Sequence, residues 1–148
     1  MLFRSEYSEL KLRRALKNSK MLYADVNAGY DPLYAEVFEK NNSAYVGKGA
    51  AISKYTGARG KSGSNDANAE YLGILRKAFD DAKVEYQTAE LGRIDAGGGG
   101  TIAYIPAAYG MDVIDIGVPI LNMHAPYEVS SKADVYETTK CYKAFYEM

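Results

Sequence analysis

The sequence predicts an α/β protein, on three observations from its second half. Residues 111–117 form an apolar stretch rich in β-branched side chains, which is typical of a buried strand. A run of four glycines, Gly97–Gly100, precedes a helix-type segment, and the only histidine, His124, follows the strand. This order of loop, helix, strand and polar side chain is that of α/β units, in which sites gather beyond the carboxyl ends of strands.

Composition narrows the class of protein. A length of 148 residues, with 47% hydrophobic and 25% charged residues, predicts one globular domain. Because the 18 Lys and Arg residues are balanced by 19 Asp and Glu residues, we expect no binding of nucleic acid. No apolar run approaches the roughly 20 residues that span a membrane, and residues 1–4 are too short and too early charged for a signal peptide. The single cysteine, Cys141, excludes an internal disulfide, so we expect a cytoplasmic location.

The first half of the chain alternates helix and strand signals. We expect a helix from Ser5 to about Lys20, a strand at 21–26, a helical turn within 33–42 and a strand at 50–55. Asp25 lies at the end of the first strand, where a buried carboxylate is costly unless a positive group or hydrogen-bond donors meet it. It is therefore a candidate metal ligand, and bonding to backbone amides of the next loop is the structural alternative.

Residues 55–62 resemble a phosphate-binding loop in part. Their Gly-Lys-Ser end matches the P-loop pattern, and a helix predicted from 64 or 65 to 82 follows. However, Tyr55 stands where the pattern needs its first glycine, and a tyrosine Cβ obstructs the turn that wraps the phosphates. A degenerate nucleotide-binding domain is therefore an alternative and not the favoured hypothesis.

The glycine run follows a strand predicted at 84–89 and opens a helix predicted at 101–109. Consecutive glycines are costly in chain entropy, so a mere linker is an unfavourable use inside a domain. Bare backbone beside a helix start can approach a ligand and present N–H groups to an anion. A tight loop with positive φ explains some of these glycines without a ligand, and we favour the ligand hypothesis.

The chain ends in a helix that begins near Ser131, whose side chain and Asp134 resemble a capping box. The inner face of this helix is predicted to consist of Val135, Thr138, Tyr142 and Phe145. Between the last strand and this helix, His124 is a candidate metal ligand, although a lone histidine is commonly a surface or structural residue.

Four motifs have a recognisable order and spacing. They are Asp25-Val26-Asn27-Ala28 with Tyr30-Asp31-Pro32, Asp95 through Gly97–Gly100 to Thr101-Ile102, Tyr109-Gly110-Met111-Asp112-Val113, and Met123-His124-Ala125-Pro126-Tyr127-Glu128. Together they resemble the zinc aminopeptidase family that contains aspartyl aminopeptidase and vacuolar aminopeptidase I. The resemblance implies a three-layer α/β/α sandwich. Residues 1–148 would be the C-terminal segment of its catalytic domain, without the N-terminal part and an inserted dimerisation domain.

The resemblance also implies a site. In such enzymes two zinc ions, or other divalent metals, polarise the carbonyl of the N-terminal peptide bond and generate a hydroxide nucleophile. By resemblance, Asp25 would be a carboxylate ligand of one ion and His124 the late histidine ligand of the other. Gly99, Gly100 and Thr101 would lie against the backbone of a peptide substrate. Intact members would form a homo-oligomer, a tetrahedral dodecamer.

Two departures from the family pattern matter. Ala28 stands where the aspartyl branch has a histidine, so the lysyl or neutral branch, with its similar Asp-Val-Asn-Ala run, fits better. The first His, the bridging Asp and the Glu-Glu pair that supplies the general base have no counterpart in this sequence, where His124 is the only histidine. We therefore expect the isolated chain to be inactive. A non-catalytic folded fragment or oligomerisation module is the alternative function.

Overall fold

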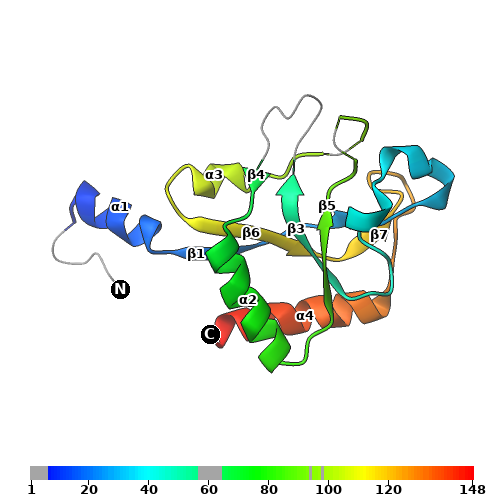
Figure 1. Cartoon of the computed structure of the whole chain (residues 1–148). Coiled ribbons are helices and arrows are strands. Elements are labelled where there is room, and N and C mark those ends of the chain that lie inside the picture. Colours follow the sequence, from blue (N-terminus) through cyan, green and yellow to red (C-terminus); the bar gives the residue numbers. More distant parts are fainter. Residues whose placement is uncertain (1–6, 57–64, 94, 98) are drawn as a thin grey trace.

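The computed structural model describes residues 7–56, 65–93, 95–97 and 99–148, which are built around one mixed sheet (Figure 1). Its strands are β1 (Lys20–Ala24), β3 (Ala50–Thr56), β4 (Asn65–Asp66), β5 (Tyr86–Glu90) and β6 (Asp112–Gly117). The order runs β1-β6-β3, and both β4 and β5 pair with β3. β1 and β6 are parallel, as are β3 and β5, whereas β6 and β3 are antiparallel. The predicted α/β class is confirmed.

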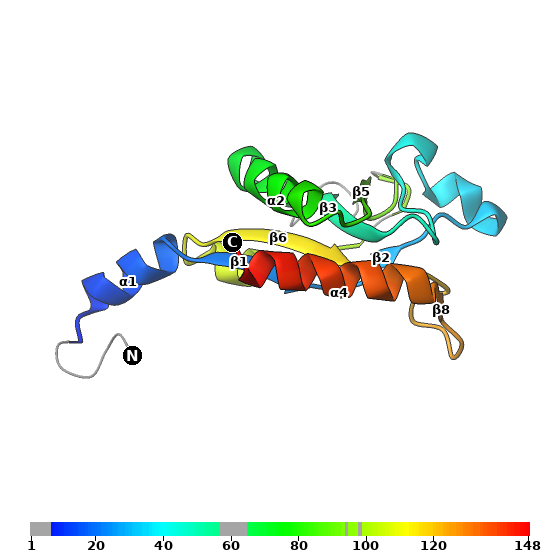
Figure 2. The ribbon, with the colours of Figure 1, turned by 90° about the horizontal axis from the view of Figure 1, so that it is seen from below.

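Two helices cover one face of this sheet. Leu75 and Phe79 of α2 (Ala69–Asp81) and Cys141 of α4 (Lys132–Tyr146) share one buried core. The strand residues in this core are Ala50, Ile52, Ile114 and Ile116. Figure 2 shows α4 running along β1 and β6, with α2 beside it. Because side chains of a strand alternate between the two faces, the isoleucines of β6 point toward the helices and the residues between them point away.

The opposite face of the sheet carries less regular structure. Its small buried residues Ala51 and Ala89 pack with Ala44 from the loop before β3. The short helix α3 (Tyr104–Ala107) lies against β6 on this side. The described residues therefore supply the sheet and one helical layer of an α/β/α sandwich, together with a small part of a second layer.

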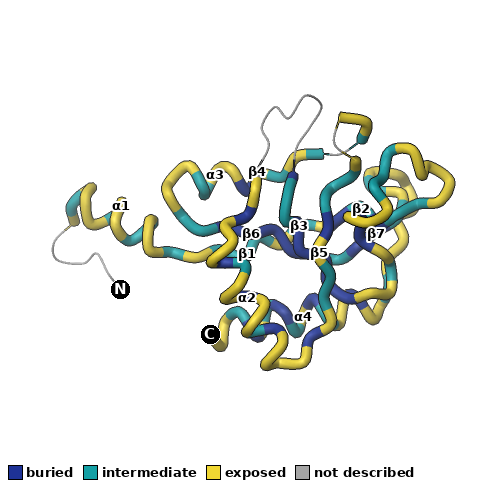
Figure 3. Tube along the Cα trace, viewed as in Figure 1, coloured by how far each residue is buried: buried dark blue, intermediate teal, exposed yellow. Residues whose placement is uncertain are grey.

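The remaining elements extend from the two ends of the sheet. They are α1 (Glu9–Lys17), two 3-10 helices, η1 (Pro32–Val37) and η2 (Lys40–Asn42), and a small sheet of β2 (Asn27–Ala28), β7 (Pro119–Leu121) and β8 (Val129–Ser130). Figure 3 shows burial concentrated in the main sheet and on the inner sides of α2 and α4, while α1 is largely exposed. In the described ranges, no helix has the length and apolar character needed to cross a membrane.

Several predicted boundaries differ from those observed. The first helix begins at Glu9 because the Ser8 hydroxyl accepts from the backbone of Lys11, and Ser5 lies outside the described residues. The helix predicted from 64 or 65 begins at Ala69, since Asn65 and Asp66 pair with β3 and Asn68 caps the helix. Local pattern does not reveal such strand pairing, which is decided by tertiary structure.

The predicted inner face of α4 is wrong at its first position. Ser131 caps this helix as predicted, but Val135 is 47% exposed and Asp134 only 1% exposed. The Asp134 carboxylate accepts the backbone N–H of Gly47 at 2.6 Å and that of Gly49 at 2.8 Å. These bonds offset the cost of burying the charge, so a carboxylate takes the inward position that the periodicity assigned to valine.

This contact predicts a large effect of one substitution on stability. Asp134→Ala leaves two N–H groups of the turn before β3 without an acceptor, so we expect a loss of about 2–4 kcal/mol in the free energy of unfolding. Val135→Ala, at the exposed neighbouring position, should change it by less than about 0.5 kcal/mol. Urea unfolding followed by circular dichroism measures both, and equal losses in the two variants would contradict the assignment.

Candidate metal and substrate cleft

A cleft of about 320 Å³ lies where the loops after β2, β5 and β7 meet. Its lining residues are Ala28, Val37, Phe38, Leu91, Gly92, Gly99, Met123 and His124. Two of the predicted site residues, His124 and Gly99, are therefore brought together although they lie 25 residues apart in the chain. The remainder of the lining is mostly apolar, which is typical of ligand sites.

His124 is held by its backbone. It follows β7 in a tight turn with φ of 69°, and its N–H donates to the Glu128 carboxylate at 2.6 Å. A positive φ is costly for a residue with a side chain, so the surrounding loop must hold it there. The imidazole is exposed at the cleft and has no hydrogen-bond partner within the described part of the chain. The ring is therefore available to a ligand.

Asp25 lies between β1 and β2, half-buried and outside the lining of the cleft. The parallel pairing of β2 with β7 brings the segment after Asp25 beside the segment before His124. Gly117 permits this close approach, because a Cβ at that position would overlap the backbone carbonyl of Asp25. Among the described residues no backbone amide donates to the Asp25 carboxylate, so the structural alternative has no support there. Those residues also contain no group of three or more His, Cys, Asp or Glu placed to hold a metal.

The glycines of the predicted substrate loop differ in their positions in the structure. Gly99 lines the cleft, but its N–H donates to the carbonyl of Leu91 at 3.2 Å and is not free for an anion. Gly97 approaches so closely that a Cβ would collide with the carbonyl of Val37. None of Gly97, Gly99 and Gly100 has a positive φ, and of the three only Gly97 makes an approach that a Cβ would block.

Thr101 points away from the cleft and into the sheet. Its hydroxyl donates to Oδ2 of Asp115 at 3.0 Å and accepts from the backbone of Ala103 at 3.3 Å. The residue thus anchors the glycine-rich loop to β6. Its predicted backbone contact with substrate stays a prediction.

Asp115 was missed as a site residue by sequence reasoning. It lies in the middle of β6, 2% exposed, with Tyr23 and Ser53 as its register neighbours on the two flanking strands. Burial raises the pKa of this carboxyl to about 6, the Thr101 hydroxyl opposes that rise, and the charge of Asp25 adds to it. A carboxylate at the centre of an apolar strand is the signal that could have identified it.

A second buried polar group lies beside Asp115. Asn27 is fully buried and donates through Nδ2 to the Ser53 hydroxyl at 2.8 Å. Its Oδ1 and the Oδ1 of Asp115 are both buried without a partner in the described part of the chain. Buried polar atoms are nearly always satisfied in folded proteins, by protein groups or by ordered water, so these two acceptors are notable features of the site.

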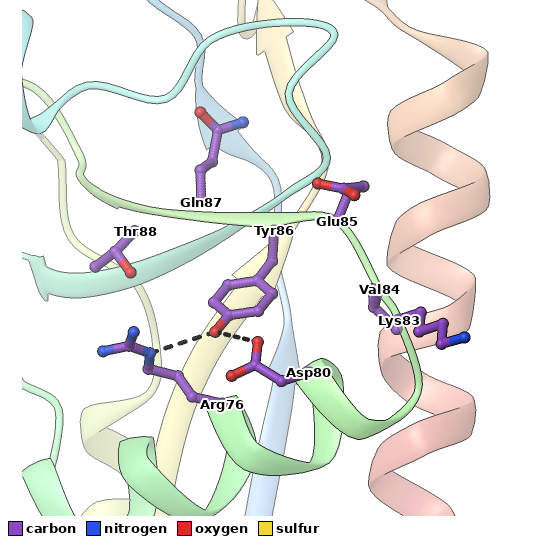
Figure 4. Close-up of a pocket in the computed structure, with 8 residues that line it drawn as sticks. All are labelled: Arg76, Asp80, Lys83, Val84, Glu85, Tyr86, Gln87 and Thr88. Atoms are coloured by element: carbon purple, nitrogen blue, oxygen red, sulfur yellow. Dashed lines mark hydrogen bonds between the residues drawn. The ribbon is translucent and has the colours of Figure 1, made fainter.

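Another concavity, of about 580 Å³, lies between α2 and β5 (Figure 4). There the Tyr86 hydroxyl donates to Asp80 at 3.0 Å and accepts from Arg76 Nε at 3.3 Å. The Tyr86 ring also packs edge-on against Phe79, with 5.6 Å between centroids. These contacts hold α2 on the edge strand, and no predicted site residue lines this hollow. The phosphate-binding pattern cannot be compared with the structure, because residues 57–64 lie outside the described residues.

The profile of one protein family, described as Aminopeptidase I zinc metalloprotease (M18), matches residues 1–146. The chain belongs to this family. A probable M18 family aminopeptidase 1 from Clostridium acetobutylicum is 64% identical over 140 residues, which are 95% of this chain and 30% of that protein. A relative of the same description from Thermotoga maritima is 46% identical over 95% of this chain and 31% of that protein.

Solved structures agree. Aminopeptidase I from C. acetobutylicum superposes with a TM-score of 0.86 at 64% identity, over 93% of this chain and 30% of that one. The M18 aminopeptidase from T. maritima gives 0.89 at 45% identity, over 95% of this chain and 31% of that one. The S. cerevisiae mApe1 dodecamer gives 0.74 at 21% identity, over 97% of this chain and 30% of that one, which shows a shared fold. The M18 chain described here thus spans about 30% of the length of its curated relatives.

The raised pKa of Asp115 predicts a pH-dependent stability. Its ordinary pKa is 3.8 and its folded pKa about 6, so the folded state holds this proton more tightly than the unfolded state. The stabilisation is therefore full below pH 3.8 and is lost as the pH rises through about 6. The side chain of Asp115→Asn cannot ionise. We therefore expect the free energy of unfolding of this variant to rise by about 2 kcal/mol relative to that of the wild type as the pH goes from about 4 to about 7.

Urea unfolding at a series of pH values measures this gain. Asp112→Asn, at the more exposed start of the same strand, controls for the loss of one carboxylate. Parallel pH curves for the wild type and Asp115→Asn would show that this carboxyl titrates normally.

The hydrogen bond from Thr101 to Asp115 predicts that Thr101→Val and Thr101→Ser have different effects on stability and on the loop. Thr101→Val leaves a buried carboxylate oxygen without its donor and should cost about 1–3 kcal/mol at neutral pH. It should also shift the NMR signals of Gly99 and of the His124 ring, whereas Thr101→Ser, which keeps the hydroxyl, should restore them. Thr139→Val removes a hydroxyl that bonds only its own exposed helix, at 2.9 Å from the Val135 carbonyl, and serves as control. Unshifted signals in Thr101→Val would exclude an anchoring role.

Proposed function

We propose that this chain supplies the C-terminal part of the catalytic domain of a zinc aminopeptidase, which removes N-terminal residues from peptides. The family match over residues 1–146 carries the proposal. The cleft lined by His124 and Gly99 supports it, because it brings one proposed metal ligand and one proposed substrate-binding residue together. Assembly into a homo-oligomer and a cytoplasmic location belong to the same proposal.

The donor chemistry of the two proposed metal ligands suits zinc. Imidazole and carboxylate are common zinc ligands, and neither the His124 ring nor the Asp25 carboxylate is engaged by another described side chain. Asp25 and His124 would each hold one of two ions, and Gly99 and Gly100 would border the substrate backbone. When bound, the metal pair supplies polarisation of the peptide carbonyl and activation of water.

The residues of this chain would bind and orient and would not transfer the proton. The turn at His124, fixed by Glu128, aims the ring into the cleft, and Asp115 holds the glycine-rich loop through Thr101. Within the described residues no cluster of three ligands and no general base is placed at the cleft. The activity therefore needs residues beyond those described, and this separates the proposed function from that of a self-sufficient enzyme.

A covalent chimera tests the proposal. The part of the C. acetobutylicum relative that precedes its matched region is fused to this whole chain, and hydrolysis of Leu-p-nitroanilide and Lys-p-nitroanilide is measured. We expect chelator-sensitive activity. Its loss in His124→Ala and in Asp25→Ala should exceed the roughly 10–100-fold typical of residues that only support a metal ligand.

Asp81→Asn, at the exposed end of α2, should leave this activity unchanged and controls for the loss of a carboxylate. A folded chimera without activity would favour the non-catalytic alternative. Full activity in His124→Ala would remove that residue from the site.

The isolated chain should have negligible peptidase activity. A catalytic zinc normally takes three protein ligands, and the chain offers two proposed ones that do not share a ligand cluster in the described structure. Highly purified chain is assayed on the same substrates with added zinc and then with chelator. Chelator-sensitive hydrolysis by this material would show that the site is complete without a partner.

A further inference from the structure

The outer edge of β1 has no neighbouring strand among the described residues. Within the described residues β1 pairs with β6 alone. The Ser19 carbonyl accepts from Asp112 N–H, so residues 21 and 23 direct their backbone groups to β6 and residues 20, 22 and 24 direct theirs outward. An unpaired edge of this kind is a template for another strand, and proteins normally cover or block it.

Large apolar side chains are exposed around α3. Ile102, Tyr104, Ile105 and Tyr109 are 51%, 59%, 47% and 64% exposed. They fall within eight consecutive residues (102 to 109) on the sheet face opposite α2 and α4. Soluble proteins rarely expose several large apolar side chains close together unless that surface binds a partner or ligand.

The first helix is held by local contacts that include the Ser8 cap and an exposed Arg13–Glu9 ion pair. α1 has nine residues and none is buried, although Leu12 and Leu16 line a groove of about 650 Å³ with Ala108 and Tyr109. Isolated helices of fewer than roughly 12–15 residues are marginal in water, so packing must supply the stability of α1. The open groove indicates that part of this packing comes from another polypeptide.

We propose that the outer edge of β1, α1 and residues 102–109 form one docking surface, and that its occupant is the polypeptide that precedes this region in M18 aminopeptidases. This chain would bind that segment in trans, without a covalent link. The inference rests on the proposed function. The length argues for this occupant, because the matched region is 30% of the C. acetobutylicum relative and most of that protein therefore lies outside it.

Charge argues against a second copy as occupant. The cations of α1 are Lys11, Arg13, Arg14 and Lys17, against one anion, Glu9. A two-fold contact of this helix with itself would bring like charges together, which is unfavourable for association.

Trans-complementation tests the inference. The preceding segment of the C. acetobutylicum relative, carrying an affinity tag, is co-expressed with this untagged chain. Native mass spectrometry and hydrogen exchange then follow the complex. We expect a 1:1 complex in which the amides of residues 22 and 24, α1 and residues 102–109 become protected while those of α2 and α4 do not change.

A matched pair of substitutions locates the contact. Ile105 on the docking surface and Ile74 on α2 are both 47% exposed. Ile105→Asp should weaken the complex by about tenfold or more, as expected for an interface anchor, and Ile74→Asp should have little effect. Ala24→Pro, which removes one outward N–H while leaving the β6 pairing intact, should weaken it as well.

The outcomes separate this inference from the proposed function. An active chimera with no complex in trans, or equal effects of the two aspartates, overturns the docking surface and leaves the function standing. A complex without aminopeptidase activity supports the docking surface and counts against the function. Self-association of this chain, with protection of the same residues, overturns the assignment of the occupant.

Discussion

The central constraint in this structure is the two-sided character of β6. This strand pairs in parallel with β1 and antiparallel with β3, so both neighbours take their register from it. Ile114 and Ile116 face the helices, and Asp115 between them faces the other way. A shift of one residue would place the carboxylate in the apolar core and the isoleucines beside Thr101. The register therefore sets the core and the candidate site at the same time.

The two faces of the sheet differ in how fully helices cover them. On the helical face, α2 and α4 close a core that includes Cys141, whose burial raises the pKa of its thiol to about 12 and keeps it a neutral packing group. Cys141 is thus a free cysteine that acts as a small buried residue of the core. The other face holds the buried Asp115 and Asn27 and the exposed apolar side chains of α3. In the described residues this face therefore has less helical cover than the first.

The glycine-rich loop shows how one pattern can be interpreted in two ways. The sequence hypothesis was that bare backbone presents N–H groups to a ligand, but the Gly97 and Gly99 amides donate to the Arg93 and Leu91 carbonyls. Gly97 lets the loop pass close to the Val37 backbone, and Gly99 lines the cleft with His124. Thr101 then ties the loop to β6 through Asp115. The loop is therefore shaped by its own bonds before any ligand arrives.

The sequence by itself determined the α/β class, the approximate positions of the strands, the cap of the last helix and the family. These features depend on local periodicity, short-range capping and motif spacing, all of which can be recognised along the chain. Tertiary structure alone decided that Asn65 and Asp66 join the sheet, that Asp134 turns inward to the Gly47 turn, and that Asp115 holds Thr101. Each of these contacts joins residues from different elements, and their energies come from burial and from donors that become adjacent only after the chain has folded.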